Sequence, residues 1–169
     1  MKKIEDILKT KKDLSLSKKT VINLLYTYGY INNKLNNVLK PFEISIQQFN
    51  VLRILRGQNS TPVSLSTVQE RMINKMSNTT RLIDKLIKKD YVRKEINKHN
   101  KRKIDITITK KGLTFLGQID SIIDSTEQDI VSSLTNGETL ELIRLLGKVR
   151  LIANVSLSKE PNSQLKLPY

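Results

Sequence analysis

The spacing of apolar residues changes once along this chain, and that change limits the fold more than any other feature. From residue 17 to residue 90, apolar residues recur every three or four positions, which is the period of a helix. Residues 104–109 then alternate strictly, so that three isoleucines are expected to face a core while Asp105 and Thr107 face water. The helical period returns after Thr109. The pattern predicts a mostly helical chain with one β-hairpin.

Capping residues divide the first part of the chain into two helices. Ser17 is a suitable N-cap for a long amphipathic helix, and Pro41 prevents that helix from continuing. Ser45 and Gln48 have the spacing of a capping box, in which each side chain accepts a hydrogen bond from the other residue's backbone amide. The helix that begins there is expected to end at Gly57.

Two short helices and the hairpin are expected next. The helices cover about residues 65–73 and 76–90, and the strands cover 91–97 and 104–109. The candidate N-caps are Ser64 or Ser66 for the first helix and Asn74 or Ser77 for the second. The loop between the strands is polar and strongly basic.

The last two predicted helices are long. Thr109 is the expected cap of one, and Asn136 opens the other. Together with the helix at 17–40, they carry more apolar surface than one small domain can bury. Their natural partner is a second copy of the chain, with a long hairpin inside one chain as the alternative. Residues 1–16 are expected to form a basic extension and residues 155–169 a flexible tail.

Positive charge is concentrated in one quarter of the chain. The 30 Lys and Arg and the 16 Asp and Glu residues leave a net charge of +14 at pH 7. Residues 71–111 hold 14 of the basic and 4 of the acidic residues, so +10 of that charge lies there. Codon bias explains frequent lysine but not this clustering. A local field of this size attracts polyanions, and nucleic acid is the expected partner rather than water alone.

The composition excludes most catalytic and cofactor chemistry. With no cysteine and a single histidine, His99, the chain cannot build disulfides or thiolate metal sites, and zinc sites and histidine-based triads are not expected. The acidic residues near the basic segment are scattered among lysines, with no acid–base pair. No apolar run spans a membrane, and the N-terminus lacks a signal-peptide pattern. We expect a cytoplasmic protein that is not an enzyme and needs no cofactor or metal.

The order of the predicted elements indicates a winged helix-turn-helix, because two short helices are followed by a basic hairpin. The winged domain is expected over about residues 45–112, within a larger domain at 17–154. The flanking helices at 17–40 and 112–154 would pair two copies. The predicted fold class is therefore mostly α with a small β-hairpin wing and long dimerisation helices.

The second short helix has the polar start of a recognition helix, which presents its N-terminal residues to base edges. Arg81 suits a bidentate contact to guanine, and Asn78 suits one to adenine. In the loop, Arg102 lies between lysines and suits a minor groove. The expected DNA contacts are Ser77, Asn78, Thr80, Arg81, Lys85, Lys101, Arg102 and Lys103. The structural alternatives are a helix cap at Ser77, an intrahelical pair of Arg81 with Asp84, and loop charge that only discourages aggregation.

These segments resemble the MarR family of bacterial winged-helix regulators. Residues 68–72 and 77–86 are similar to its helix-turn-helix without gaps. The family's wing signature, Asp-x-Arg, five residues, Leu-Thr-x-x-Gly, has its counterpart in Asn100-Lys101-Arg102 followed by Ile108-Thr109-Lys110-Lys111-Gly112. The resemblance extends over about residues 17–153. Three departures are Asn100, where the family has an aspartate that braces the arginine, Asp90, where a glycine usually closes the recognition helix, and Lys75, where many members have a capping serine.

The resemblance implies a homodimeric repressor or activator, and a repressor is the expected role. Each recognition helix would enter a major groove and each Arg102 the adjacent minor groove. A two-fold dimer implies a near-palindromic operator with half-sites about 34–36 Å apart, or a multiple of that distance. Many members bind small aromatic or lipophilic effectors. Tyr26, Tyr30 and Phe49 are candidates to line such a pocket, or are ordinary core and interface aromatics. The alternative function is a basic protein that binds DNA or RNA non-specifically, without an effector.

Overall fold

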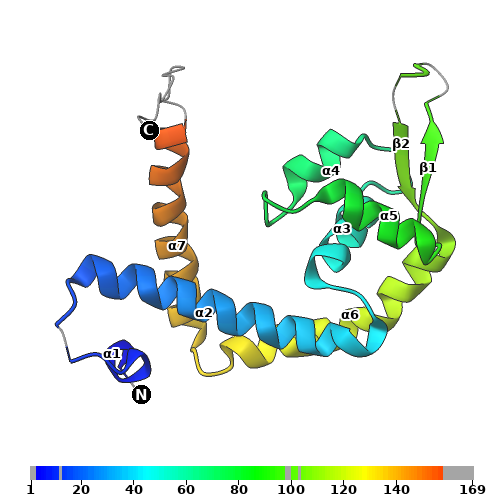
Figure 1. The fold of residues 1–169 in the computed structure, drawn as a ribbon. Helices are drawn as coiled ribbons and strands as arrows, with labels where there is room; N and C mark the ends of the chain where they lie inside the picture. The colour runs from blue at the N-terminus through cyan, green and yellow to red at the C-terminus, as the bar shows by residue number, and fades with distance from the viewer. Residues whose placement is uncertain (1–2, 12, 98–99, 103, 158–169) are drawn as a thin grey trace. The chain divides into compact units, whose positions relative to one another are not determined.

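A computed structural model describes residues 3–11, 13–97, 100–102 and 104–157 of the chain (Figure 1). The elements are α1 (Ile4–Leu8), α2 (Leu16–Leu39), the 3-10 helix η1 (Lys40–Phe42), α3 (Ile46–Arg56), α4 (Leu65–Arg71), α5 (Thr79–Lys88), β1 (Val92–Ile96), β2 (Ile104–Ile108), α6 (Lys110–Val131) and α7 (Asn136–Leu157). The predicted mostly helical fold with one hairpin is confirmed. The chain forms two compact units, Met1–Glu127 and Gln128–Tyr169.

The core of the first unit lies where α3, α5, the hairpin and the start of α6 meet. Leu52, Ile83, Leu86, Ile106 and Leu116 are all completely buried there. The capping box predicted at the start of α3 is present. The Ser45 side chain accepts the Gln48 backbone N–H, and the Gln48 side chain accepts the Ser45 backbone N–H. Since these apolar residues come from α3, α5, β2 and α6, these three helices and the hairpin share one core.

The hairpin is a two-stranded antiparallel sheet that is anchored at one end only. Val92 pairs with Ile108 next to the core, while Ile96 pairs with Ile104 at the far end. Val63 adds an isolated bridge to Ile106. The expectation that all three isoleucines of β2 face a core is wrong for Ile104, which is 50% exposed, because the hairpin extends beyond the helices there.

Thr107 also departs from the alternating pattern expected for β2. Its side chain was expected to face water but is 9% exposed. The guanidinium of Arg93 on the paired strand donates a hydrogen bond from Nε to Thr107 Oγ1 at 3.0 Å. This cross-strand contact covers the Thr107 hydroxyl. The predicted alternation is therefore correct for Ile106, Ile108 and the partly exposed Asp105, but not for Thr107.

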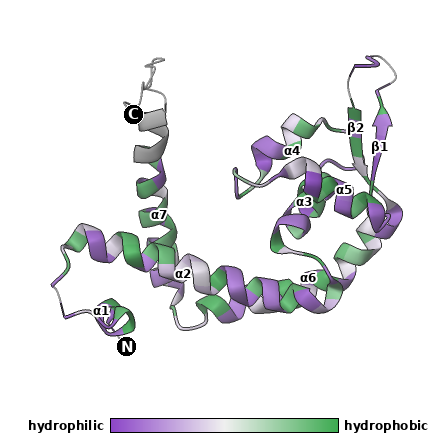
Figure 2. Cartoon of the chain, viewed as in Figure 1, coloured by the Kyte–Doolittle hydropathy of each residue, from purple (hydrophilic) through white to green (hydrophobic). Residues whose placement is uncertain are grey.

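α2 is a 24-residue helix along which hydrophobic and hydrophilic residues are interspersed (Figure 2), and several of its apolar side chains are exposed. It begins two residues earlier than predicted, because Ser15 rather than Ser17 accepts the backbone N–H of Lys18. Only Leu39 at its end is buried. The exposed large side chains of α2 are Leu16, Val21, Leu24, Leu25, Tyr26, Tyr28 and Tyr30.

The N-terminal extension contains a short helix, α1, that the sequence does not predict. Ile4 of α1 is 6% exposed. Lys19 of α2 forms ion pairs with Glu5 at 2.8 Å and with Asp13 at 3.1 Å. These hydrogen bonds raise the pKa of Lys19, and the bond with Lys19 lowers the pKa of Glu5. Two acidic residues of the extension are therefore paired with a lysine of α2.

The second unit holds the end of α6 and all of α7. Thr135 caps α7 by accepting the Glu138 backbone N–H at 3.3 Å, and hydrogen bonds from Thr135 lower the pKa of Glu138. None of the side chains described on α7 is buried. Its exposed large apolar residues are Leu140, Leu142, Ile143, Leu145, Val149 and Leu151. No helix in the described part of the chain is both long and apolar enough to cross a membrane. The predicted flexible tail lies almost wholly outside the described residues.

Candidate nucleic-acid interface

α5 has one apolar face inside the core and one polar, basic face outside. Ile83 and Leu86 are fully buried, which fixes the rotation of the helix about its axis. The exposed side chains are Thr80, Arg81, Asp84, Lys85 and Lys88. Three of the five are cationic, so the outward face of α5 is suited to contact a polyanion.

Asn78 caps α5, and neither Asn74 nor Ser77 does. The Asn78 side-chain oxygen accepts a hydrogen bond from the Arg81 backbone N–H at 3.0 Å. This use of the oxygen competes with the bidentate contact to adenine that the sequence suggested, since that contact needs the same oxygen as well as the amide nitrogen. Asn78 is thus the cap of the helix, and its contact to adenine stays a prediction.

The turn between α4 and α5 is held by Gln69, a residue that sequence reasoning missed. Its side-chain nitrogen donates to the Lys75 carbonyl at 2.6 Å, and its oxygen accepts a hydrogen bond from the Thr79 hydroxyl. Thr79 is only 3% exposed. A threonine at the first position of a helix gives no sequence signal of burial, so the pair could not be recognised from spacing alone.

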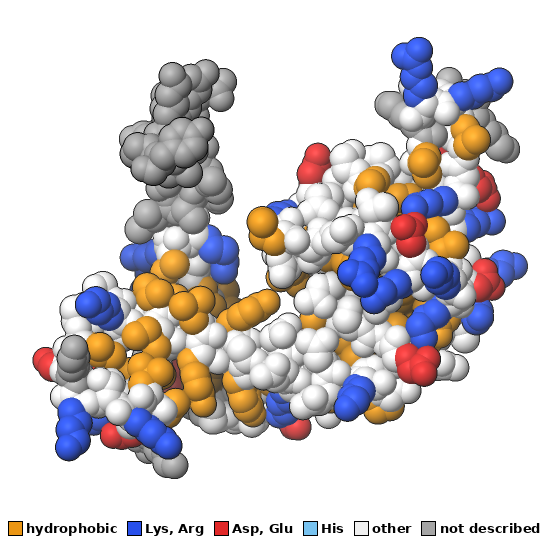
Figure 3. All heavy atoms as spheres, viewed as in Figure 1, with side chains coloured by type: hydrophobic (Ala, Val, Ile, Leu, Met, Phe, Trp, Pro, Cys, Tyr) orange, Lys and Arg blue, Asp and Glu red, His pale blue; other side chains and the backbone are white. Residues whose placement is uncertain are grey.

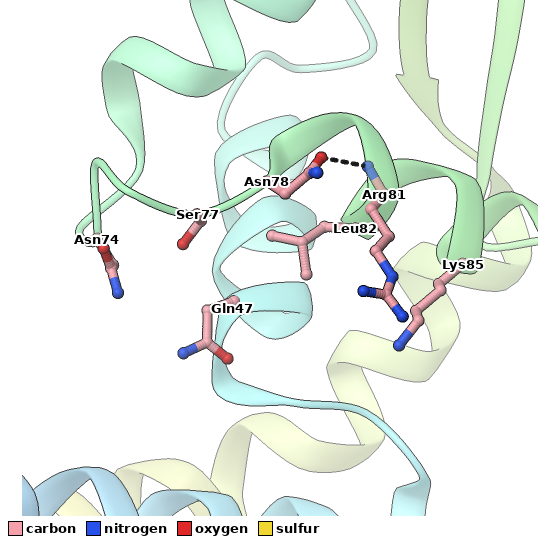
Figure 4. A pocket seen from close by; sticks show the side chains of 7 residues that line it. All are labelled: Gln47, Asn74, Ser77, Asn78, Arg81, Leu82 and Lys85. Atoms are coloured by element: carbon pink, nitrogen blue, oxygen red, sulfur yellow. Dashed lines mark hydrogen bonds between the residues drawn. The ribbon is translucent and has the colours of Figure 1, made fainter.

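A hollow of about 390 Å³ opens beside the outward face of α5 (Figure 4). Ser77, Asn78, Arg81 and Lys85 of the predicted set line it, and Thr80 does not. The other lining residues are Gln47 from α3, Asn74 from the turn and Leu82. The Ser77 hydroxyl is buried without a hydrogen-bond partner among the described residues. The hollow therefore brings together donors and cations from two helices and the turn.

The tip of the hairpin presents Lys101 and Arg102, both of them exposed. Asn100 accepts the Arg102 backbone N–H at 3.0 Å through its side-chain oxygen, and its own N–H donates to the Asn97 side chain at 2.8 Å. The side chain of Asn100 thus shapes the turn. Lys103, which was expected to contact DNA, and His99 lie outside the described residues.

The hairpin and α5 are linked by an ion pair on the exposed side of the unit. Lys94 of β1 lies 2.6 Å from Asp84 of α5, measured from Nζ to Oδ1. Asp84 is therefore paired with the wing and not with Arg81, and Arg81 remains exposed. Figure 3 shows Lys and Arg side chains over α5 and the hairpin on the face in view. This link helps to keep the two basic elements in a fixed relation.

The base of the hairpin depends on close backbone contact between β1 and α6. The Thr109 hydroxyl caps α6 as predicted, because it accepts the Gly112 N–H at 3.0 Å. A Cβ atom at Gly112 would lie 2.3 Å from the Tyr91 carbonyl oxygen, so only glycine fits. Asp90 has a φ of 59°, the left-handed conformation for which the family has glycine.

A separate cavity of about 250 Å³ lies between α2, α3 and the α4–α5 turn. Phe49 lines it as expected, but Tyr26 and Tyr30 do not, and Tyr28 is the tyrosine of α2 that reaches it. Tyr26 and Tyr30 are 51% and 55% exposed. The other lining residues include Ile31, Leu35, Arg53, Met72, Ile73 and Glu127. Most of this lining is apolar, with one cation and one carboxylate at its edge.

Comparisons with known proteins agree with this architecture. The model of the MarR family matches residues 44–104. TcaR of Staphylococcus aureus, an HTH-type transcriptional regulator, is 35% identical over 115 residues, which is 65% of this chain and 72% of TcaR. A mutant MarR of E. coli complexed with operator DNA has a TM-score of 0.71 and 24% identity, covering 82% of this chain and 99% of that one.

A further solved structure is BpsR of Bordetella bronchiseptica, whose DNA binding is regulated by 6-hydroxynicotinic acid. It has a TM-score of 0.73 and 19% identity, and the match covers 82% of this chain and 98% of BpsR. The matched proteins are transcription regulators and not enzymes, in agreement with the composition. The sequence motifs, the fold and these relatives lead to one conclusion: this chain belongs to the MarR family of DNA-binding, winged helix-turn-helix transcriptional regulators.

Proposed function

We propose that this protein is a homodimeric repressor that acts in the bacterial cytoplasm and binds a near-palindromic operator in double-stranded DNA. The observation that carries the proposal is that one buried core holds the two elements that expose Arg81 and Arg102. Arg81 lies on the outward face of α5 and Arg102 at the hairpin tip, and both elements are built on the same buried core. In this arrangement α5 enters the major groove while Arg102 reaches the neighbouring minor groove.

Exposed apolar surface supports the homodimer. α2 leaves Val21, Leu24 and Leu25 exposed, and α7 has no buried side chain among those described. Amphipathic helices of this length normally bury one face, and a two-fold interface between copies would do so. Two recognition helices related by that axis would contact half-sites about 34–36 Å apart, or a multiple of that distance.

The cavity beside Phe49 supports control by a small effector. Its volume of about 250 Å³ is slightly below the usual range for small-molecule sites, and its lining is largely apolar. Ile73 and Asn74 of its wall belong to the turn that leads into α5. A compact aromatic or lipophilic molecule bound there would therefore touch the segment that positions the recognition helix. Its binding would cause the protein to dissociate from DNA, and repression would end.

Arg81→Ala is expected to reduce discrimination between operator and random DNA by about 1–3 kcal/mol, because a bidentate contact to guanine is lost. The operator is first obtained by selecting duplexes from a random pool with the wild-type protein. Dissociation constants are then measured for that duplex and for a shuffled duplex at one salt concentration. Lys40→Ala is the matched control, since it removes an exposed cation outside α5 and the hairpin.

Several outcomes would contradict the proposal. Equal losses on both duplexes would make Arg81 a phosphate contact and not a base reader. A selection that enriches no sequence, or equal competition by RNA, would favour the alternative of a non-specific nucleic-acid-binding protein. A sedimentation mass equal to the 19.4 kDa of one chain would exclude the homodimer.

Ile31→Trp is expected to fill the Phe49 cavity and weaken the binding of an apolar aromatic probe, anilinonaphthalene sulfonate, by about tenfold or more. Tyr26→Trp adds the same indole at a position that does not line the cavity and should leave probe binding unchanged. Fluorescence titration measures both. Equal probe affinity in the two variants would show that the probe binds elsewhere and would remove this cavity as the effector site.

A further inference from the structure

The turn between α4 and α5 exposes two large apolar side chains, although its backbone is firmly held. Ile73 is 83% exposed and Met76 is 93% exposed, while the adjacent Met72 is 1% exposed. The Met76 N–H donates to the side-chain oxygen of Asn74 at 3.0 Å, and the Ser77 N–H donates to the Asn74 carbonyl at 3.2 Å. The exposure of Met76 therefore belongs to an ordered turn and is not the result of fraying.

The two apolar side chains have different surroundings. Ile73 is part of the wall of the cavity beside Phe49. Met76 does not line that cavity or the hollow beside α5. It precedes the Asn78 cap of α5 by two residues and is therefore next to the end of the helix that reads bases.

The chemistry around Met76 selects its contact. Asn74 and Ser77 are polar, and Arg71 and Lys75 are exposed cations on the same turn or at the end of α4. A phosphate backbone would satisfy these cations but would offer nothing to a thioether side chain. The apolar group that a major groove presents on its base edges is the 5-methyl of thymine. Methionine is flexible and polarizable, so it can follow the position of such a methyl group.

We propose that Met76 is a specificity-determining residue that packs against the 5-methyl group of one thymine in each operator half-site. This inference rests on the proposed DNA-binding function and adds a base preference to it. Arg81 would select a base by hydrogen bonding, while Met76 would select a neighbouring one by apolar contact. Loss of the thymine methyl should therefore matter only while Met76 is present.

Replacing single thymines of the selected operator duplex by deoxyuridine tests the proposal, because deoxyuridine pairs identically but lacks the methyl group. One symmetric pair of replacements should weaken wild-type binding about fourfold for each methyl contact, as expected for the burial of one methyl group. Met76→Ala should bind the thymine and deoxyuridine duplexes with equal affinity. Ile96→Ala removes another exposed apolar residue, from β1, and should retain the wild-type loss.

The outcomes separate this inference from the function on which it rests. If the Met76→Ala variant shows the same loss as wild type at the same thymine, or if wild type is indifferent to every replacement, the methyl contact is refuted while operator recognition stands. If wild type does not distinguish the selected duplex from a shuffled one, both proposals fail. If Met76→Ala sediments with the mass of one chain while wild type sediments as a dimer, Met76 takes part in a protein contact, and this result would also overturn the inference.

Discussion

An Arg102→Ala variant is expected to bind the operator about 30-fold more weakly than wild type, since hydrogen bonds to charged groups contribute roughly 2 kcal/mol. Arg102 is exposed at the hairpin tip. Its backbone N–H, which donates a hydrogen bond to the Asn100 side chain, remains after the substitution. The turn should keep its shape, and the melting temperature and the sedimentation mass should not change. Titration of fluorescent operator DNA measures the loss.

Two neighbouring variants define what Arg102 contributes. Lys101→Ala removes an exposed cation from the same tip and should cost only a few-fold, with the salt slope reduced by about one unit. Arg102→Lys keeps the charge but loses the planar fork of donors, so it should recover only part of the affinity. If Arg102→Ala binds as wild type does, the hairpin is not a minor-groove reader.

Gly112→Ala is expected to lower the free energy of unfolding by about 2 kcal/mol or more, because overpacking forces backbone shifts. The added Cβ would lie 2.3 Å from the Tyr91 carbonyl oxygen and 2.8 Å from a side-chain carbon of Ile108. The same carbonyl accepts the Thr109 N–H at 3.0 Å, so relief of the clash must disturb the base of the hairpin. Urea unfolding monitored by circular dichroism measures the change.

Gly117 provides the control within the same helix. A Cβ there would have no heavy atom within 4 Å, and the position is exposed. Gly117→Ala should therefore stabilise the protein by about 0.5–1 kcal/mol through helix propensity alone. Equal stability of Gly112→Ala and Gly117→Ala would contradict the close packing of α6 against Tyr91.

The sequence predicted those features that depend on local chemistry. The capping box at Ser45 and the cap at Thr109 follow from residue types at fixed spacing, and both are present. The hairpin followed from strict alternation. Asp90, which stands where a family glycine usually closes the recognition helix, adopts a left-handed conformation. In each case neighbours along the chain decide the outcome.

The features that the sequence could not predict depend on distant contacts. Asn74, Ser77 and Asn78 are all good caps, and the choice of Asn78 is made together with the bonds of Gln69 to Lys75 and Thr79. The role of a tyrosine in the cavity wall depends on how α2 is rotated against α3, which favours Tyr28 over its neighbours.

The burial of a strand residue also depends on what covers it. Ile104 has the same place in the alternating pattern as Ile106, yet it is half exposed because no helix within the described part of the chain packs against the far end of the hairpin. Alternation specifies a face of a strand but not the length over which that face is covered. Which residues of that face are buried depends on the elements that pack against it in the folded unit.

The ion pair between Lys94 and Asp84 has a consequence for the response to ionic strength. Its side chains are 29% and 51% exposed, so dissolved salt screens the pair. Salt also weakens phosphate contacts by restoring the counterion atmosphere of DNA. An osmotic rise in internal salt would therefore loosen the alignment of helix and wing at the same time as it reduces their attraction to DNA. Operator affinity should then decline with salt more steeply than the number of phosphate contacts alone would give.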